Sequence, residues 1–172
     1  MVPPEAPKTN DKDKKLPPCG LYRTTAPMPG RSEQVPAGRL VYMHNHSQQG
    51  PPLVLLPARN VHNRWIFHDR GYLVRDLAYL DTLRSLPAEG FYVLVEHLHV
   101  TGAVLPERSL VQLGYDLAGR PILFPARRVE NTIVFPDRGF RFDHDALLAR
   151  IEPAGFVVGE EPVAPGGERL LH

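Results

Sequence analysis

The 172-residue sequence has very little cysteine, no long apolar run and almost no net charge. Its single cysteine, Cys19, excludes an intrachain disulfide and a cysteine-rich metal site, and is typical of a reducing compartment. No stretch approaches the roughly 18 apolar residues of a membrane span, and residues 1–15 lack the apolar segment of a signal peptide. We therefore expect a cytoplasmic protein with no membrane partner.

Lysine is also absent from most of the chain. All four lysines lie within residues 1–15, whereas the sixteen arginines run from Arg23 to Arg169. This preference for arginine indicates a GC-rich bacterial genome. The lysine- and proline-rich residues 1–18 are predicted to form a disordered arm, and residues 165–172 a flexible tail. The net charge of +1, with both signs interspersed after residue 20, argues against a nucleic-acid partner, because such proteins carry a basic patch.

One segment of the chain repeats another. Residues 57–72 and residues 125–140, which lie 68 positions further on, are identical at nine of sixteen positions. The shared letters include Pro-Ala-Arg at the start of each segment and Asp-Arg-Gly near its end. The flanking sequence aligns as well, with residues 35–46 opposite residues 105–116. The sequence therefore predicts an internal tandem duplication.

The alignment also predicts where each copy lies. Downstream of the repeated segments, residues 86–95 align with residues 152–158. We assign residues 19–104 to a lead-in segment and repeat 1, and residues 105–164 to repeat 2. Each unit of about sixty residues has a marginal core by itself, so we expect the copies to pack together with approximate two-fold symmetry.

Short apolar runs separated by turn residues predict a β-β-β-α-β order for each copy. Residues 110–115 and 121–124 read as a hairpin around the turn at 116–119, with 40–44 and 53–56 as its counterpart. A third strand is expected at 64–68. The closing strand is expected at 91–95 in the first copy and at 156–158 in the second. The fold class is therefore α+β, and mainly β.

The helix and the turns of each copy carry specific signals. Leu77, Leu80 and Leu83 follow Asp76, a residue suited to cap a short helix, and Asp143 and Asp145 are expected to do the same in the second copy. Asn63 and Asn131 suit a left-handed turn position. In the two Asp-Arg-Gly turns we expect Gly71 and Gly139 to have positive φ angles.

Histidine is the only metal-ligating residue type present in quantity. His44 and His46 are two positions apart, as are His97 and His99, and such residues on a strand share one face. The two pairs could together bind Zn²⁺ or another transition metal, although we expect no cofactor from the sequence as a whole. The second copy has Gly114 opposite His44, so the histidines are not required by the fold.

The repeated arginines Arg59, Arg70, Arg127 and Arg138 need a separate explanation, because arginine has no special role in turn geometry. They could brace the packing of the two copies through carboxylates such as those of Asp69 and Asp137. They could instead bind a partner, since arginine is enriched in protein interfaces. Both interpretations stay open at this point.

Catalytic motifs are not found in the sequence. Cys19 lacks a recognisable base that would activate its thiol, and Trp65 is predicted to be a core residue. We expect a non-catalytic binding or scaffold module that acts through protein–protein contacts, either with another protein or by self-association. The alternative is a metal-binding protein or metal-dependent enzyme with its histidine site in repeat 1.

Overall fold

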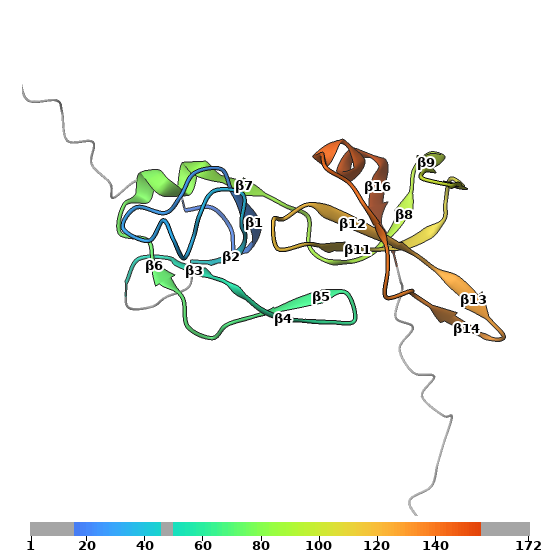
Figure 1. Cartoon of the computed structure of the whole chain (residues 1–172), viewed down its shortest axis with the longest axis horizontal. Helices are drawn as coiled ribbons and strands as arrows, with labels where there is room; N and C mark the ends of the chain where they lie inside the picture. The colour runs from blue at the N-terminus through green and yellow to red at the C-terminus, as the bar shows by residue number, and fades with distance from the viewer. Residues whose placement is uncertain (1–15, 46–49, 156–172) are drawn as a thin grey trace, which may run out of the picture.

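A computed structural model describes residues 16–45 and 50–155, and its ordered elements are mainly short antiparallel strands (Figure 1). Two five-stranded sheets form the body, and three hairpins of two strands each accompany them. The tail, most of the arm, His46 and the strand expected at 156–158 lie outside the described residues. The α+β, mainly β prediction is confirmed.

The first sheet has the strand order β6-β3-β2-β1-β7, and all its pairings are antiparallel. The strands in chain order are β1 (Gly20–Thr24), β2 (Leu40–His44), β3 (Leu53–Leu55), β6 (Tyr72–Leu73) and β7 (Leu83–Ser85). The two-residue strand β6 lies at one edge and the three-residue strand β7 at the other. The longer strand β2 therefore lies at the centre of the sheet.

The second sheet has the order β15-β12-β11-β8-β16, again wholly antiparallel. Its strands are β8 (Gly90–Leu94), β11 (Leu110–Tyr115), β12 (Pro121–Pro125), β15 (Phe140–Arg141) and β16 (Ile151–Pro153). The central strand is β11, and the two-residue strand β15 forms one edge. In both sheets the predicted hairpin supplies the central strand and one neighbour.

One strand that was assigned to the first unit lies in the second sheet. The strand at 91–95, expected to close the first unit, is β8, and it pairs with β11 and β16 of the second sheet. The strand that follows the helix within the first sheet is β7, which pairs with β1. Alternating polarity predicts where a strand lies, but it does not predict which distant strand will be its neighbour.

Three hairpins complete the fold. They are formed by β4 (Pro57–Val61) with β5 (Arg64–Phe67), by β9 (Leu98–Val100) with β10 (Ala103–Leu105), and by β13 (Arg127–Val129) with β14 (Thr132–Val134). In Figure 1 the β4–β5 hairpin extends from the first sheet toward β11. The β13–β14 hairpin, at the lower right, points away from the first sheet.

Each predicted helix is a short 3₁₀ helix, η2 (Leu77–Thr82) or η3 (Asp145–Arg150). Asp76 caps η2 as predicted, because its carboxylate accepts a hydrogen bond from the N–H of Ala78 at 3.0 Å. The prediction for η3 is wrong, since His144 occupies the capping position without a side-chain hydrogen bond. Within residues 16–45 and 50–155, no helix is long and apolar enough to cross a bilayer.

The left-handed turn position is confirmed in one hairpin and shifted in the other. Asn63 has a φ of 64°, and His62 before it has a φ of 50°. In the β13–β14 turn the left-handed residue is Glu130, with a φ of 53°, rather than Asn131. The two hairpins therefore have different turn conformations despite their similar sequences.

The two repeated glycines are required by close packing rather than by a positive φ. A Cβ atom at Gly71 would lie 2.5 Å from the carbonyl oxygen of Val54, and one at Gly139 would lie 2.5 Å from that of Leu123. Neither glycine is among the described residues with positive φ. The prediction of left-handed glycines is wrong here, because the edge strands β6 and β15 begin directly against their neighbours.

The buried side chains form two clusters. One lies within the first sheet and includes Val41, Met43 and Val54, which are fully buried. The other is centred on the second sheet but also contains Leu21 and Leu40 from the first. Complete burial of Leu40 contributes about 2 kcal/mol to stability. The two sheets are therefore joined by shared apolar packing.

Candidate protein-interaction surface

The tip of the β4–β5 hairpin is hydrogen-bonded to the central strand of the second sheet. The side-chain amide of Asn63 donates to Oε1 of Gln112 at 3.1 Å, and Nε2 of Gln112 donates to the carbonyl oxygen of His62 at 2.8 Å. Gln112 is only 5% exposed, so both ends of its amide need a partner. The hairpin supplies both, which fixes its position on β11.

Gly114 allows the hairpin to approach this strand. A Cβ atom at Gly114 would lie 2.6 Å from the carbonyl oxygen of Asn63, closer than atoms in proteins pack. The sequence alignment places His44, on the central strand β2 of the first sheet, opposite Gly114. A hairpin could therefore not lie on β2 in the same way unless the His44 side chain and the strand shifted.

Trp65 and Glu89 hold the side of the same hairpin. The indole Nε1 of Trp65 donates to the carbonyl oxygen of Tyr115 at 2.7 Å, and its backbone N–H donates to Oε2 of Glu89 at 2.8 Å. Trp65 is half-buried against the shared apolar cluster, rather than fully in the core as predicted. Burial raises the pKa of Glu89, and the hydrogen bond from Trp65 opposes that shift.

An ionic cluster joins the two sheets at a second place. The carboxylate of Asp145, at the start of η3, binds the guanidinium of Arg23 on β1, and its Oδ2 lies 3.0 Å from Nε of Arg84 on β7. Asp145 is 10% exposed and Arg23 16%, so solvent screens their interaction only weakly. No local sequence pattern indicates this contact, and the sequence predicted only a capping role for Asp145.

Among the described residues, none covers the β13–β14 hairpin in a comparable way. Val129, Ile133 and Val134 are 53, 59 and 38% exposed, and every residue of both strands is exposed. Val129 pairs with Thr132 and Ile133 with Arg128, which places apolar side chains on both faces of the hairpin. Two-fold symmetry predicts that this hairpin docks on the first sheet as β4–β5 docks on the second. The observed exposure departs from that expectation.

An aromatic pair continues this apolar surface toward the second sheet. The ring of Phe135, directly after β14, stacks on that of Phe91 at 5.0 Å between centroids. Phe91 is nevertheless 44% exposed. We call Phe91, Val129, Ile133, Val134 and Phe135 the hairpin patch. Exposed apolar side chains gathered on one element in this way are a feature of surfaces that bind other molecules.

The four predicted partner-binding arginines are all exposed. Arg59 lies on β4, Arg127 on β13, and Arg70 and Arg138 in the turns before β6 and β15. Within the described part of the chain, none of the four forms an ion pair with a carboxylate. The ionic contact between the sheets uses Arg23 and Arg84 instead. Partner binding by the four arginines stays a prediction, and Arg127 lies next to the hairpin patch.

The predicted metal ligands are distributed over different elements. His44 ends β2, where its Nδ1 lies 3.8 Å from the thiol of Cys19. His97 precedes β9 and its Nδ1 accepts from the N–H of Glu107 at 3.2 Å, while His99 lies within β9. The prediction that His97 and His99 lie on one strand is therefore wrong, because only His99 belongs to β9. His46 is outside the described residues, among which no group of three metal-ligating side chains occurs.

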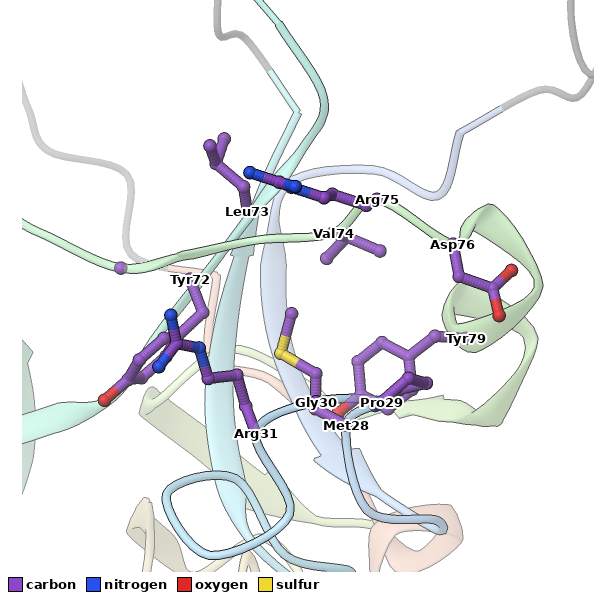
Figure 2. Close-up of a pocket in the computed structure, with 11 residues that line it drawn as sticks. Met28, Pro29, Gly30, Arg31, Tyr72, Leu73, Val74, Arg75, Asp76 and Tyr79 are labelled. Carbon is purple, nitrogen blue, oxygen red and sulfur yellow. The ribbon is translucent and has the colours of Figure 1, made fainter.

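A cavity of about 480 Å³ lies beside β6 and η2 (Figure 2). Met28, Val74 and Tyr79 are its buried residues, at 4, 1 and 3% exposure, and Arg31 and Arg75 are exposed at its rim. The Arg31 guanidinium lies over the Tyr72 ring, 5.6 Å from its centroid. No sequence motif indicates this cavity, because its lining residues come from two separate segments, 28–31 and 71–79.

Comparison of the chain with family models, curated proteins and solved structures found no match. The candidate surfaces are therefore judged by their own chemistry. The hairpin patch is apolar, exposed and bordered by arginine, whereas the cavity is concave and combines an apolar floor with a cationic rim. The first suits a protein surface and the second a small molecule.

Proposed function

We propose that the chain is a non-catalytic binding module whose hairpin patch on β13–β14 contacts another protein. The observation that carries this proposal is the exposure of Val129, Ile133 and Val134, at 53, 59 and 38%, on a hairpin that extends from the body. Apolar side chains on both faces of a two-stranded hairpin lose contact with water only when a partner covers them. The patch is the binding surface.

The composition of the hairpin supports a protein partner. Arg127 pairs with Val134 across the hairpin, and Arg128 with Ile133. An apolar centre with arginine beside it resembles the composition of protein interfaces, where arginine is enriched and lysine is depleted. Isolated two-stranded hairpins are marginally stable in water, so contact with a partner also stabilises this one. Arg138, in the following turn, extends the contact as the sequence suggested.

The partner is a different protein rather than a second copy of this chain. The β4–β5 hairpin already occupies β11, where it bonds Gln112 and lies against Gly114. The central strand of the first sheet has His44 at the position aligned with Gly114, and Tyr42 there contacts Phe67 at 5.6 Å between centroids. A second copy thus offers the β13–β14 hairpin no open site of the kind that β4–β5 uses.

We also infer that the chain arose by tandem duplication. Both sheets place their two-residue strand, their predicted hairpin and their short helix in the same relative order, which supports this interpretation. The close approaches at Gly71 and Gly139 support it as well. The single cysteine and the arginine preference favour a bacterial cytoplasm as the site of action.

Photo-crosslinking tests the proposed surface. A photoreactive amino acid replaces Ile133 in one form of the full chain and Ile66 in another, because Ile66 is 42% exposed on the docked hairpin β5. We expect one defined protein to be crosslinked from position 133 in cells of the source and not from position 66. The purified partner should then bind the wild type, and Ile133→Asp should weaken binding at least about tenfold.

Two results would count against this function. In the first, position 133 is crosslinked to further copies of the chain, and light scattering shows a dimer or a larger species. That result would show that the chain binds itself rather than a different protein. In the second, the purified partner binds the wild type and Ile133→Asp with equal affinity. That result would show that the hairpin patch is not part of the interface. The Ile66→Asp variant serves as the matched control, since it adds the same charge to the other hairpin.

A further inference from the structure

The docked hairpin β4–β5 shows which backbone group of such a hairpin needs an acceptor. Val61 pairs with Arg64 across the two-residue turn. In the next pair the backbone groups of Asn60 and Trp65 point out of the hairpin, because antiparallel pairs alternate between hydrogen-bonded and non-bonded ones. The outward N–H of Trp65 donates to Oε2 of Glu89 at 2.8 Å. A carboxylate from outside the hairpin therefore satisfies the donor on this edge.

The exposed hairpin β13–β14 has the same donor without that acceptor. Val129 pairs with Thr132 across its two-residue turn. Ile133, in the next pair, therefore directs its N–H outward as Trp65 does, and it lies 68 positions after Trp65 in the chain. Among the described residues, none accepts a hydrogen bond from this N–H. The outer edge of β14 thus presents a backbone donor to a partner.

The second copy also lacks a counterpart of the carboxylate. The offset of 68 residues that relates Trp65 to Ile133 places Val157 opposite Glu89. Val157 lies outside the described residues, but its side chain is apolar and cannot accept a hydrogen bond. At this position the chain therefore lacks the acidic residue with which it binds its own first hairpin.

The charge of the exposed hairpin favours an acidic acceptor. Its strands carry Arg127 and Arg128 and no carboxylate, since Glu130 lies in the turn. Nε of Arg128 donates to the carbonyl oxygen of Glu130 at 3.0 Å, and neither arginine forms an ion pair within the described part of the chain. Arg128 and Ile133 share one face of the hairpin. Acidic and apolar side chains together would therefore complement this surface.

We propose that the partner covers the hairpin patch with an apolar segment that contains a glutamate or aspartate, whose carboxylate accepts a hydrogen bond from the N–H of Ile133. This proposal rests on the function proposed above and adds the chemistry of the partner. The contact of Glu89 with the N–H of Trp65 is its precedent within the molecule. A hydrogen bond to a carboxylate is stronger than one to a neutral acceptor, so the acidic residue also provides specificity.

NMR titration with two synthetic peptides tests the acceptor. The probes are the capped peptide Thr-Val-Glu-Val-Thr and the same peptide with glutamine in place of glutamate, added to the ¹⁵N-labelled full chain. We expect the glutamate peptide to move the amide resonance of Ile133 saturably and to bind at least about fivefold more tightly than the glutamine peptide. The amide of Trp65 is the internal control, because Glu89 already accepts from it and it should not move.

Proline at position 133 removes the donor, and alanine at the same position is its matched control. Ile133→Pro and Ile133→Ala both lose the isoleucine side chain, but only the alanine variant keeps the N–H. Proline is tolerated at an edge position whose N–H faces outward. The preference for the glutamate peptide should persist in Ile133→Ala and fall below about twofold in Ile133→Pro. The amide resonances of β13 in each free variant check that the hairpin is formed.

Three results would overturn the proposal. The first is equal affinity of the wild type for the two peptides, and the second is an Ile133 amide that neither peptide moves at up to about 5 mM. The third is a shift of that amide in the free chain when Glu160→Gln and Glu161→Gln are combined, which would mean that the chain supplies its own acceptor. The photo-crosslinking test does not use these peptides, so a failure of the carboxylate is distinguished from a failure of the hairpin patch.

Discussion

The hairpins β4–β5 and β13–β14 have similar sequences but opposite surroundings. The first is held on the second sheet by Gln112, Tyr115 and Glu89, whereas the second carries Ile133 at 59% exposure. The difference depends on what each hairpin can reach. The first has a neighbouring sheet with a glycine at the contact, and the second points away from the body (Figure 1). Two hairpins of similar sequence can thus differ in role, one as an internal contact between the sheets and the other as an exposed surface.

The largest effect is expected from breaking the ionic contact that holds the sheets together. Asp145→Ala should destabilise the protein by about 3 kcal/mol, since it leaves the guanidinium of Arg23 poorly solvated and without its carboxylate. Urea unfolding measures this. Asp143→Ala is the matched control, because Asp143 is 84% exposed and lies 3.4 Å from Arg120. Similar losses in the two variants would contradict a special role for Asp145.

The next largest effect concerns the docking of the first hairpin. Gly114→Ala should cost about 2 kcal/mol, because its Cβ atom would lie 2.6 Å from the carbonyl oxygen of Asn63. The fluorescence of Trp65, the only tryptophan, should change as the hairpin moves. Gly155→Ala is the control, since a Cβ atom there meets nothing within 4 Å. Unchanged stability of Gly114→Ala would mean that the hairpin does not depend on close approach.

A smaller effect on stability is expected from the titration of Glu89, which accepts a hydrogen bond from the docked hairpin. Because the pKa of Glu89 is raised in the folded protein, the folded state binds more protons than the unfolded one above about pH 4.5. This group therefore stabilises the fold most at low pH, and its contribution declines as the pH rises through the raised pKa. Glu89→Gln should flatten that decline in urea unfolding between pH 4 and pH 8. An unaltered pH profile would exclude Glu89 as its source.

The smallest effect on stability is expected at the exposed hairpin. Ile133→Asp should change the free energy of unfolding by no more than about 0.5 kcal/mol, because Ile133 is 59% exposed in the isolated chain. The same variant should lose affinity for the protein partner, as described above. A loss of stability as large as that in Gly114→Ala would show that the hairpin packs against the body in solution.

The sequence predicted local structure better than long-range contacts. The strands 110–115 and 121–124 were predicted correctly to within one residue because apolar runs flank a turn, and Asp76 was recognised as a cap because its partner is two residues away. The ion pair between Arg23 and Asp145 joins residues 122 positions apart, and no local pattern predicts such a contact. The pairing of β8 with β11 and β16 was not predicted, for the same reason.

The candidate sites show the same limit. The alignment identified Gly114 as a departure from His44, but only the docked hairpin shows why a glycine is needed there. The repeated glycines Gly71 and Gly139 were singled out correctly and explained wrongly, since their constraint comes from the carbonyl groups of a neighbouring strand. The exposure of β13–β14 was not foreseen, because its sequence resembles that of a hairpin that is covered.

Hydrogen–deuterium exchange of the two hairpins in the isolated monomer tests the central comparison most directly. Peptides covering residues 57–67 should exchange their amides at least about tenfold more slowly than peptides covering 127–134, because the first hairpin is docked and the second is not. Light scattering on the same sample establishes that the chain is monomeric. Equal protection of the two hairpins, or slower exchange of 127–134, would contradict the account.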